Sequence, residues 1–163
     1  MARVKKKRNL IIANNVKGLI EKLEGETEVN LDSVDIGDAG VNVLITALTS
    51  NHTVTTTYLY NNSIHNDGAK ALALFIQNDN TITDINLHAN YIEDDGAKAL
   101  AKSLVSNNTI TNINLSFNMI GDDGAKALSA SLASNTNFTT IDLGDNQQMS
   151  DEGRKEFAAA LAA

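Results

Sequence analysis

Apolar residues recur along the chain at two alternating spacings. Short segments such as 85–87, with the sequence Ile-Asn-Leu, alternate apolar and polar residues, and this period of two predicts a strand with one buried face. The segment that follows places Ala97, Leu100 and Leu104 three and four positions apart, which predicts a helix with one buried stripe. The chain is therefore expected to alternate short strands with helices.

These strand–helix units are copies of one another. The segment 81–108 returns as 109–136 and is preceded by the similar segment 53–80, each 28 residues long. A shorter copy leads this series and a further copy closes it. A strand and a helix that repeat at a short period stack into a parallel sheet covered by a layer of helices. We therefore expect five repeats over residues 27–163, with the bounds 27–52, 53–80, 81–108, 109–136 and 137–163.

Two other segments precede the repeats. Residues 9–26 are expected to form an N-terminal helical cap, because their apolar residues lie at helical spacing. These are Ile12, Val16, Leu19, Ile20 and Leu23. Residues 1–8 hold five basic residues and are expected to be a disordered, basic end. The last helix stops in Ala-Ala-Ala-Leu-Ala-Ala without a capping signal, which leaves a longer chain or pairing with another subunit open.

Charge and composition exclude several function classes. The net charge is −7, and without the five basic residues of the segment 1–8 the body has 8 basic against 20 acidic residues, or −12. Such a body repels nucleic acid and anionic membranes. The chain has no cysteine, so no disulfide, thiolate zinc site or cysteine nucleophile can form. No stretch is long enough for a membrane span or a signal-peptide core, and we expect a cytoplasmic or otherwise reducing compartment.

One motif carries a family resemblance. The pattern Leu-x-x-Asn-x-Ile-x-Asp-x-Gly runs from Leu87 to Gly96 and again from Leu115 to Gly124. It resembles the leucine-rich repeats of the ribonuclease inhibitor type, also seen in the Ran GTPase-activating protein and in NOD-like receptors. The resemblance covers residues 27–163 and implies an α/β solenoid, a short right-handed horseshoe with a parallel sheet on the concave face and helices on the convex face. In that family the concave face binds other proteins, and no catalytic motif comes with the fold.

The polar residues of this motif have a structural interpretation. One asparagine per repeat stands where the chain leaves the strand, and we expect it to satisfy the backbone groups of a buried turn. These are Asn62, Asn90, Asn118 and Asn146. One residue per repeat stands directly before the helical pattern and is a predicted N-cap of that helix. These are Asp38, Asn66, Asp94, Asp122 and Asp151. A lysine four residues later is expected to pair with an acid of its own helix, as at Lys98.

The strand positions that alternate with the core leucines are free for recognition. Their side chains must point to the exposed side of the sheet, and they differ from copy to copy while their buried neighbours do not. Aromatic residues on this side and in the adjoining loop are typical of interface hot spots. We therefore predict that a protein or peptide partner contacts Tyr58, Tyr60, Asp84, Asn86, His88, Tyr91, Asn112, Asn114, Ser116, Phe117 and Asp142.

His88 raises the alternative of hydrolysis or metal chemistry. Successive positions on one strand face are about 6.6 Å apart, so Asp84 and His88 lie roughly 13 Å apart and cannot share an ion. We therefore expect no metal ligand, no catalytic residue and no cofactor, and we interpret His88 as a polar or pH-sensitive contact residue.

The predicted function is a non-enzymatic interaction module, such as an adaptor or effector. We expect a monomer and leave end-to-end or edge self-association open. The alternative is a regulator of GTPase or actin-filament dynamics. The size, the number of repeats and the segment 28–31, Glu-Val-Asn-Leu, also look similar to the actin-capping domain of tropomodulin, and a GTPase-activating role is known in the Ran regulator family.

Overall fold

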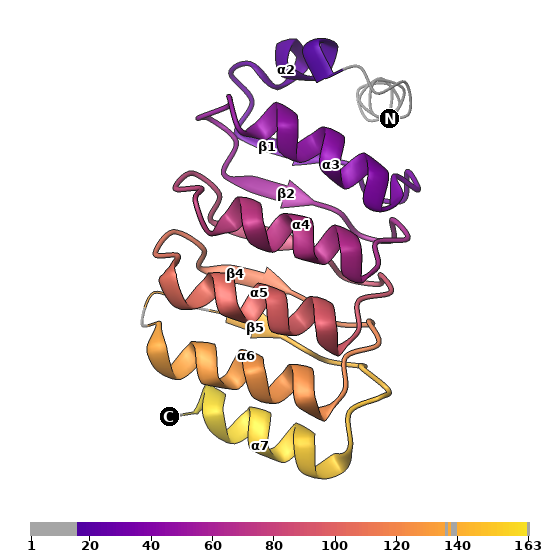
Figure 1. The fold of residues 1–163 in the computed structure, drawn as a ribbon, viewed down its shortest axis with the longest axis vertical. Helices are drawn as coiled ribbons and strands as arrows, with labels where there is room; N and C mark the ends of the chain where they lie inside the picture. Colours follow the sequence, from indigo (N-terminus) through magenta and orange to yellow (C-terminus); the bar gives the residue numbers. More distant parts are fainter. Residues whose placement is uncertain (1–15, 136, 138–139, 163) are drawn as a thin grey trace.

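The computed structural model describes residues 16–135, 137 and 140–162 as an alternation of helices and strands (Figure 1). The described part of the chain begins with a short helix, after which one strand and one helix alternate. In chain order the elements are α2 (Val16–Leu23), β1 (Glu28–Asn30), α3 (Gly37–Leu48), β2 (Thr56–Tyr58), α4 (Asn66–Ile76), β3 (Asp84–Asn86), α5 (Asp94–Ser106), β4 (Asn112–Asn114), α6 (Asp122–Ser134), β5 (Thr140–Asp142) and α7 (Asp151–Leu161).

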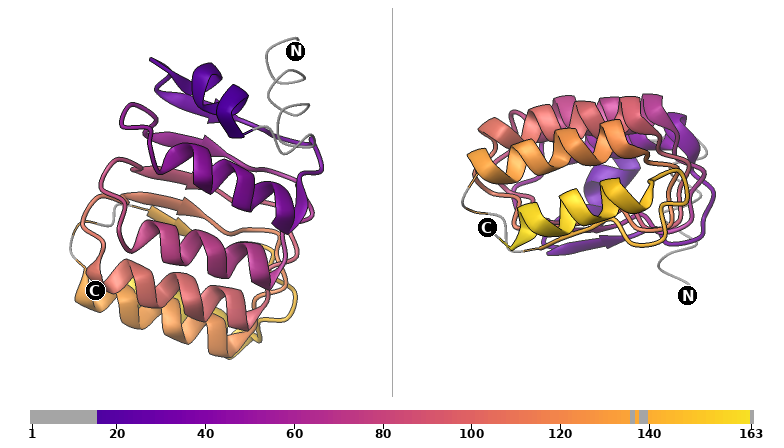
Figure 2. Two further views of the ribbon diagram at one scale, coloured as in Figure 1. Left: turned by 45° about the horizontal axis from the view of Figure 1, so that its top comes forward. Right: turned by 90° about the horizontal axis from the view of Figure 1, so that it is seen from below.

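The strands form one parallel sheet in sequence order, β1-β2-β3-β4-β5. Each strand pairs with the next at a constant offset of one repeat, so Ile85 lies beside Ile113 and Ile113 beside Ile141. The middle residue of each strand is buried and its neighbours face outward. Helices α3 to α7 lie side by side on the other face of the sheet (Figure 2).

The spacing of the two layers makes the sheet the inner face. Parallel strands lie about 4.8 Å apart, whereas packed helices need about 8–10 Å between axes. A stack of such units must bend toward its strands, which places the sheet on the concave side and the helices on the convex side. This confirms the predicted α/β solenoid.

The core consists mainly of aliphatic side chains, which come from the strand, the turn and the helix of each repeat. Leu87, Ile92, Leu100 and Leu104 are completely buried, and the corresponding residues of the other repeats join them in one cluster. None of the helices in the described part of the chain is long and apolar enough to cross a membrane.

Helix α2 packs against α3 of the first repeat. Leu19 and Leu23 are completely buried, and the side chain of Asn51 donates a hydrogen bond to the carbonyl of Leu23 at 3.0 Å. Ile20, which we predicted on the buried stripe, is 36% exposed. The basic end 1–8 and the first half of the predicted cap, with Ile12, lie outside the described residues.

The asparagines at the strand ends join neighbouring repeats, as predicted. The side-chain oxygen of Asn90 accepts from the backbone N–H groups of Asn62 and Ile64 in the preceding repeat, both at 3.0 Å. Its amide donates to the carbonyls of Leu59 and Leu87, both at 3.0 Å. Asn62, Asn118 and Asn146 are equally buried and bond in the same way.

A second set of polar residues joins the repeats at the opposite end of the helices. The amide of Asn107 donates to the carbonyls of Ile76 and Asp79, and its oxygen accepts from the N–H of Ile110 at 2.8 Å. Asn51 and Asn135 hold the same position, while Asp79 accepts in the same way but cannot donate. This second set was not predicted.

The substitution Asn90→Ala tests the first set. It leaves buried donors and acceptors of two adjacent repeats without partners, and each such group costs about 1–3 kcal/mol. We expect the free energy of unfolding to fall by at least about 2 kcal/mol in urea denaturation. Asn80→Ala removes an exposed asparagine from the preceding repeat and should change stability by less than about 0.5 kcal/mol. Equal effects of the two variants would contradict the role of Asn90.

Candidate functional site

The acids at the helix starts cap the next helix and not their own. The residue before each helix is His65, Glu93 or Gly121 in α4, α5 and α6, and none of these caps its helix through a side chain. Asp94 is instead the first residue of α5, and its Oδ1 accepts from the N–H groups of Gly121 at 2.7 Å and Gly124 at 2.9 Å. The prediction that Asp94 caps its own helix is therefore wrong.

The same correction holds along the array. Asp38 accepts from the N–H of His65 at 2.8 Å, and Asn66 accepts from those of Glu93 and Gly96 at 3.0 Å. Asp122 accepts from the N–H and the hydroxyl of Ser150, and that hydroxyl in turn accepts from the N–H of Gly153. Each of these side chains satisfies a free donor at the start of the following helix.

This cross-repeat cap explains the glycine of the motif. A Cβ added at Gly124 would lie 2.7 Å from Oδ1 of Asp94 and 2.8 Å from a methyl group of Ile120. At Gly96 the nearest atoms, from Ile92, Ala69 and the Asn66 oxygen, lie at 2.8–2.9 Å. Only glycine leaves room for the capping oxygen to reach the backbone.

Lys70 and Lys98 bond across repeats, which corrects the prediction of pairs within one helix, whereas Lys155 lies 3.8 Å from Glu152 of its own helix. Lys98 contacts Asp123 of the next helix at 2.8 Å, and Lys70 lies 3.8 Å from Asp95. The hydrogen bond from Lys98 lowers the pKa of Asp123, and the bond to Asp123 raises the pKa of Lys98. Both side chains are exposed, so we expect little contribution to stability.

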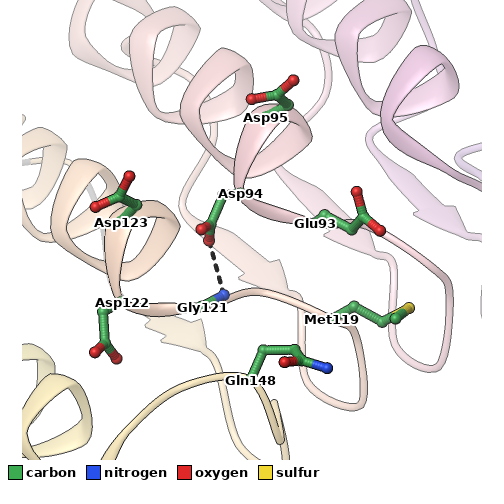
Figure 3. A pocket seen from close by; sticks show the side chains of 8 residues that line it. All are labelled: Glu93, Asp94, Asp95, Met119, Gly121, Asp122, Asp123 and Gln148. Atoms are coloured by element: carbon green, nitrogen blue, oxygen red, sulfur yellow. Dashed lines mark hydrogen bonds between the residues drawn. The ribbon is translucent and has the colours of Figure 1, made fainter.

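The acidic hollow beside these helix starts is lined by residues that serve the scaffold. It has a volume of about 720 Å³, and its lining comes from the starts of α5 and α6 and the loops beside them (Figure 3). Asp94, Asp122 and Asp123 are engaged with Gly121, Ser150 and Lys98. Among the described residues no three histidine, aspartate or glutamate side chains are grouped to hold a metal ion.

The sheet brings six of the predicted contact residues together. They line a depression of about 350 Å³ on the open face of β2 to β5. These six are Tyr58, Asp84, Asn86, Asn112, Asn114 and Asp142. Asp84 is oriented by its neighbours, because it accepts hydrogen bonds from the amide of Asn112 and the hydroxyl of Thr83.

Aromatic rings form a row where the strands end. The ring centroids of Tyr60 and His88 are 5.2 Å apart, and those of His88 and Phe117 are 5.0 Å apart. Beside this row, Tyr91 stacks on His65 at 5.1 Å. Tyr60, Tyr91 and Phe117 are 38%, 51% and 53% exposed, so the row presents apolar surface to solvent.

Ser116 holds His88 in place. The Ser116 hydroxyl donates to the side-chain oxygen of Asn114 at 2.6 Å, so its oxygen accepts the Nδ1 proton of His88, also at 2.6 Å. With its proton directed to an amide oxygen, Ser116 is not activated as a nucleophile. It is also only 5% exposed, so this predicted contact residue positions His88 and offers no contact area itself.

Phe117 occupies a backbone position that disfavours it. Its φ is +54°, in the left-handed region, as is that of the corresponding residue in every other repeat. The other residues in this position are Ser33, Asn61, Ala89 and Asp145. Asparagine and aspartate tolerate this conformation, whereas a bulky side chain in it is an outlier.

Two exposed residues beside the row were not predicted. Met119 is 39% exposed and occupies the position of Tyr91 one repeat later, so aligning the repeats would have found it. His65 was overlooked because it joins this surface by stacking on Tyr91 of the next repeat. No spacing in the sequence indicates that contact. Tyr60, His65, His88, Tyr91, Phe117 and Met119 together are called the aromatic edge below.

The fold and this surface define a class of proteins: solenoids that present an open sheet face bordered by loops. A family model described as "Leucine Rich repeat" matches residues 78–101, 106–129 and 134–158. The chain is a leucine-rich repeat protein. The ribonuclease inhibitor subtype remains a prediction.

Solved structures share this fold. A structure described as "Leiomodin-1 Actin-Binding Site 2 (ABS2)" matches 96% of this chain and 86% of its own, with a TM-score of 0.72 and 23% identity. The C-terminal domain of tropomodulin from Caenorhabditis elegans matches 91% of this chain and 92% of its own, with a TM-score of 0.73 and 18% identity. No curated protein matches the sequence significantly. At identities this low, the structural likeness shows a common fold alone.

Two substitutions of Asp94 test the cross-repeat cap. Asp94→Ala removes the acceptor for Gly121 and Gly124, and we expect unfolding to become easier by about 1–2 kcal/mol. Asp94→Asn keeps an acceptor oxygen, as Asn66 does one repeat earlier, and should cost less than half as much. Thermal unfolding at neutral pH measures both, and an alanine variant as stable as the parent would contradict the cap.

Proposed function

We propose that this protein is a non-enzymatic interaction module that binds a protein or peptide partner through its concave sheet face and the aromatic edge. Phe117 carries the proposal. Holding a residue of this kind in the left-handed region costs about 1–2 kcal/mol relative to a residue that tolerates it. More than half of the side chain is exposed, so burial in the fold offsets little of this cost.

The fold gives this aromatic side chain an edge contact with His88 but leaves the residue 53% exposed, in a backbone conformation that disfavours it. Residues in disfavoured backbone conformations cluster at functional sites. A partner that covers the ring would give it the burial that the fold does not. Aromatic residues at the centre of a contact, bordered by polar groups, are the usual arrangement of an interface hot spot. The amides and carboxylates of the sheet depression provide that polar border.

The size of the surface favours a modest partner contact. Five strands span about 19 Å from the first to the last. Such a face fits a peptide or a standard-size protein contact better than a large enveloping one. We also propose that the protein is a monomer and that it lies in the cytoplasm.

Actin is the alternative partner that the comparisons favour, because the matching segment of Leiomodin-1 is described as an actin-binding site. Co-sedimentation with filamentous actin and a pointed-end elongation assay test it. A protein that stays in the supernatant and leaves elongation unchanged would remove this alternative. A GTPase-regulating role gains no support from the family match or from these two structures.

The substitution Phe117→Asn separates folding from binding. Asparagine relieves the backbone strain, so the free energy of unfolding should rise by about 1 kcal/mol. Partner recovery in a pull-down from the native cell extract should fall at least about fivefold, as for loss of a hot-spot residue.

The matched control for Phe117→Asn is Ser33→Asn, which places asparagine in the same left-handed position of the first repeat, at φ +55°. It should leave binding unchanged. A Phe117→Asn variant that is less stable than the parent, or one that binds as the parent does, would contradict the proposal.

The two faces of the solenoid can be compared directly. Tyr58→Ala combined with Tyr60→Ala removes two rings from the concave side and should weaken partner capture at least about tenfold. Lys98→Ala removes an exposed side chain from the convex helices and should have no effect on capture. Equal losses from both variants would refute the assignment to the concave side.

A further inference from the structure

The concave sheet face carries charge of only one sign. The outward strand positions and the first residues after each strand hold four charged side chains, and all are acidic. They are Glu28, Asp32, Asp84 and Asp142. Every lysine and arginine of the described repeats lies instead on a helix, at Lys70, Lys98, Lys102, Lys126, Arg154 and Lys155.

Three acids of the helices have a cation beside them, and the acids of the sheet have none in the described part of the chain. Asp95, Asp123 and Glu152 each lie within 4 Å of a lysine. Among the described residues none of the four sheet acids has such a partner. Asp142 accepts a single hydrogen bond, from the N–H of Gly144 at 2.8 Å, and is exposed. Its second oxygen is therefore open to a bound cation.

The aromatic edge lies at the ends of β2, β3 and β4, among the strands that carry these acids. Tyr60 and His88 continue β2 and β3, and Phe117 follows β4. A guanidinium group is planar, binds carboxylates with two parallel hydrogen bonds and stacks on aromatic rings. A lysine ammonium group makes neither contact as well. The sheet face and its edge thus complement arginine more closely than lysine.

We propose that the occupant of the concave face is a cationic, arginine-bearing segment of another protein. This inference rests on the proposed function for the location of the site and goes beyond it by naming the chemistry of the partner. Asp84 and Asp142 lie two strands apart and two residues out of register, which separates them by about 12 Å. The segment therefore needs at least two cationic side chains at roughly that spacing, with an arginine against the aromatic edge.

The first experiment measures binding of fluorescent octa-arginine, octa-lysine and octa-glutamate peptides by anisotropy at about 0.1 M salt, where screening acts over about 10 Å. Octa-arginine should bind and octa-glutamate should not. Asp84→Asn combined with Asp142→Asn should weaken octa-arginine binding about tenfold, from the loss of two charge-assisted contacts.

The matched control neutralises two acids of the helices, Asp67→Asn with Glu156→Gln. Both residues are exposed, and the control changes the net charge by the same amount as the sheet variant. It should leave octa-arginine binding within twofold of the parent. Equal weakening by the two variants would mean that the peptide senses only the net charge, and it would overturn the proposal.

The preference for arginine has its own test. The parent should bind octa-arginine about threefold more tightly than octa-lysine, which is the size of an exposed cation–π contact. In Phe117→Asn that ratio should fall toward one. Equal binding of both peptides by the parent would overturn the assignment to arginine.

The basic segment of the same chain is the main competing occupant. A variant with Arg3→Gln, Lys5→Gln, Lys6→Gln, Lys7→Gln and Arg8→Gln removes its charge. Unchanged octa-arginine affinity supports an external partner. An affinity several times higher would show that this segment occupies the face, and would overturn the assignment to another protein.

The outcomes separate this inference from the proposed function. If native partner capture still depends on Phe117 while octa-arginine fails to bind, the proposed function stands and the cationic partner is refuted. If octa-arginine binding depends on Asp84 and Asp142 while native capture ignores Phe117 and the two tyrosines, the sheet binds cations but the proposed interface is wrong.

Discussion

The turns of this solenoid hold backbone N–H and C=O groups that the neighbouring repeat must satisfy. Asn90 reaches back to the turn of the preceding repeat, whereas Asp94, four residues later, reaches forward to the start of the following helix. Two opposite links from one short loop bind three repeats together. The glycine position follows from the forward link, because a Cβ would displace the capping oxygen. Stability therefore depends on the contacts between repeats as much as on each repeat.

This constraint divides the polar residues into two groups. The asparagines and acids of the loops and helix starts are engaged with the backbone, and Lys70 and Lys98 pair with acids of the next helix. In the described strands, the side chains at the outward positions bond to the backbone only within their own repeat, as where Asn86 and Asn114 accept from the N–H two residues later. The sheet face can therefore vary in sequence without loss of the fold, and this freedom allows acids, amides and aromatic rings to gather there for recognition.

Periodicity was sufficient to predict the strands, the helices, the single parallel sheet and the asparagines of the strand ends. It could not show the direction of a cap: Asp94 stands where an N-cap of α5 is expected, yet its partner is a backbone group 27 residues away. The prediction that Lys98 pairs within its own helix was wrong for the same reason. The strain at Phe117 is a property of φ, and the bond from His88 to Ser116 depends on two strands that only the fold brings together.

The convex helices are scaffold and the concave side is the proposed recognition face, and hydrogen–deuterium exchange tests this division most directly. The protein would be compared alone and bound to the partner recovered from the native extract. Added protection should appear in the segments 58–61, 86–91 and 114–119, with the exposed faces of α4 to α6 unchanged. Protection concentrated on those helices, with the strand ends exchanging as in the free protein, would contradict the account.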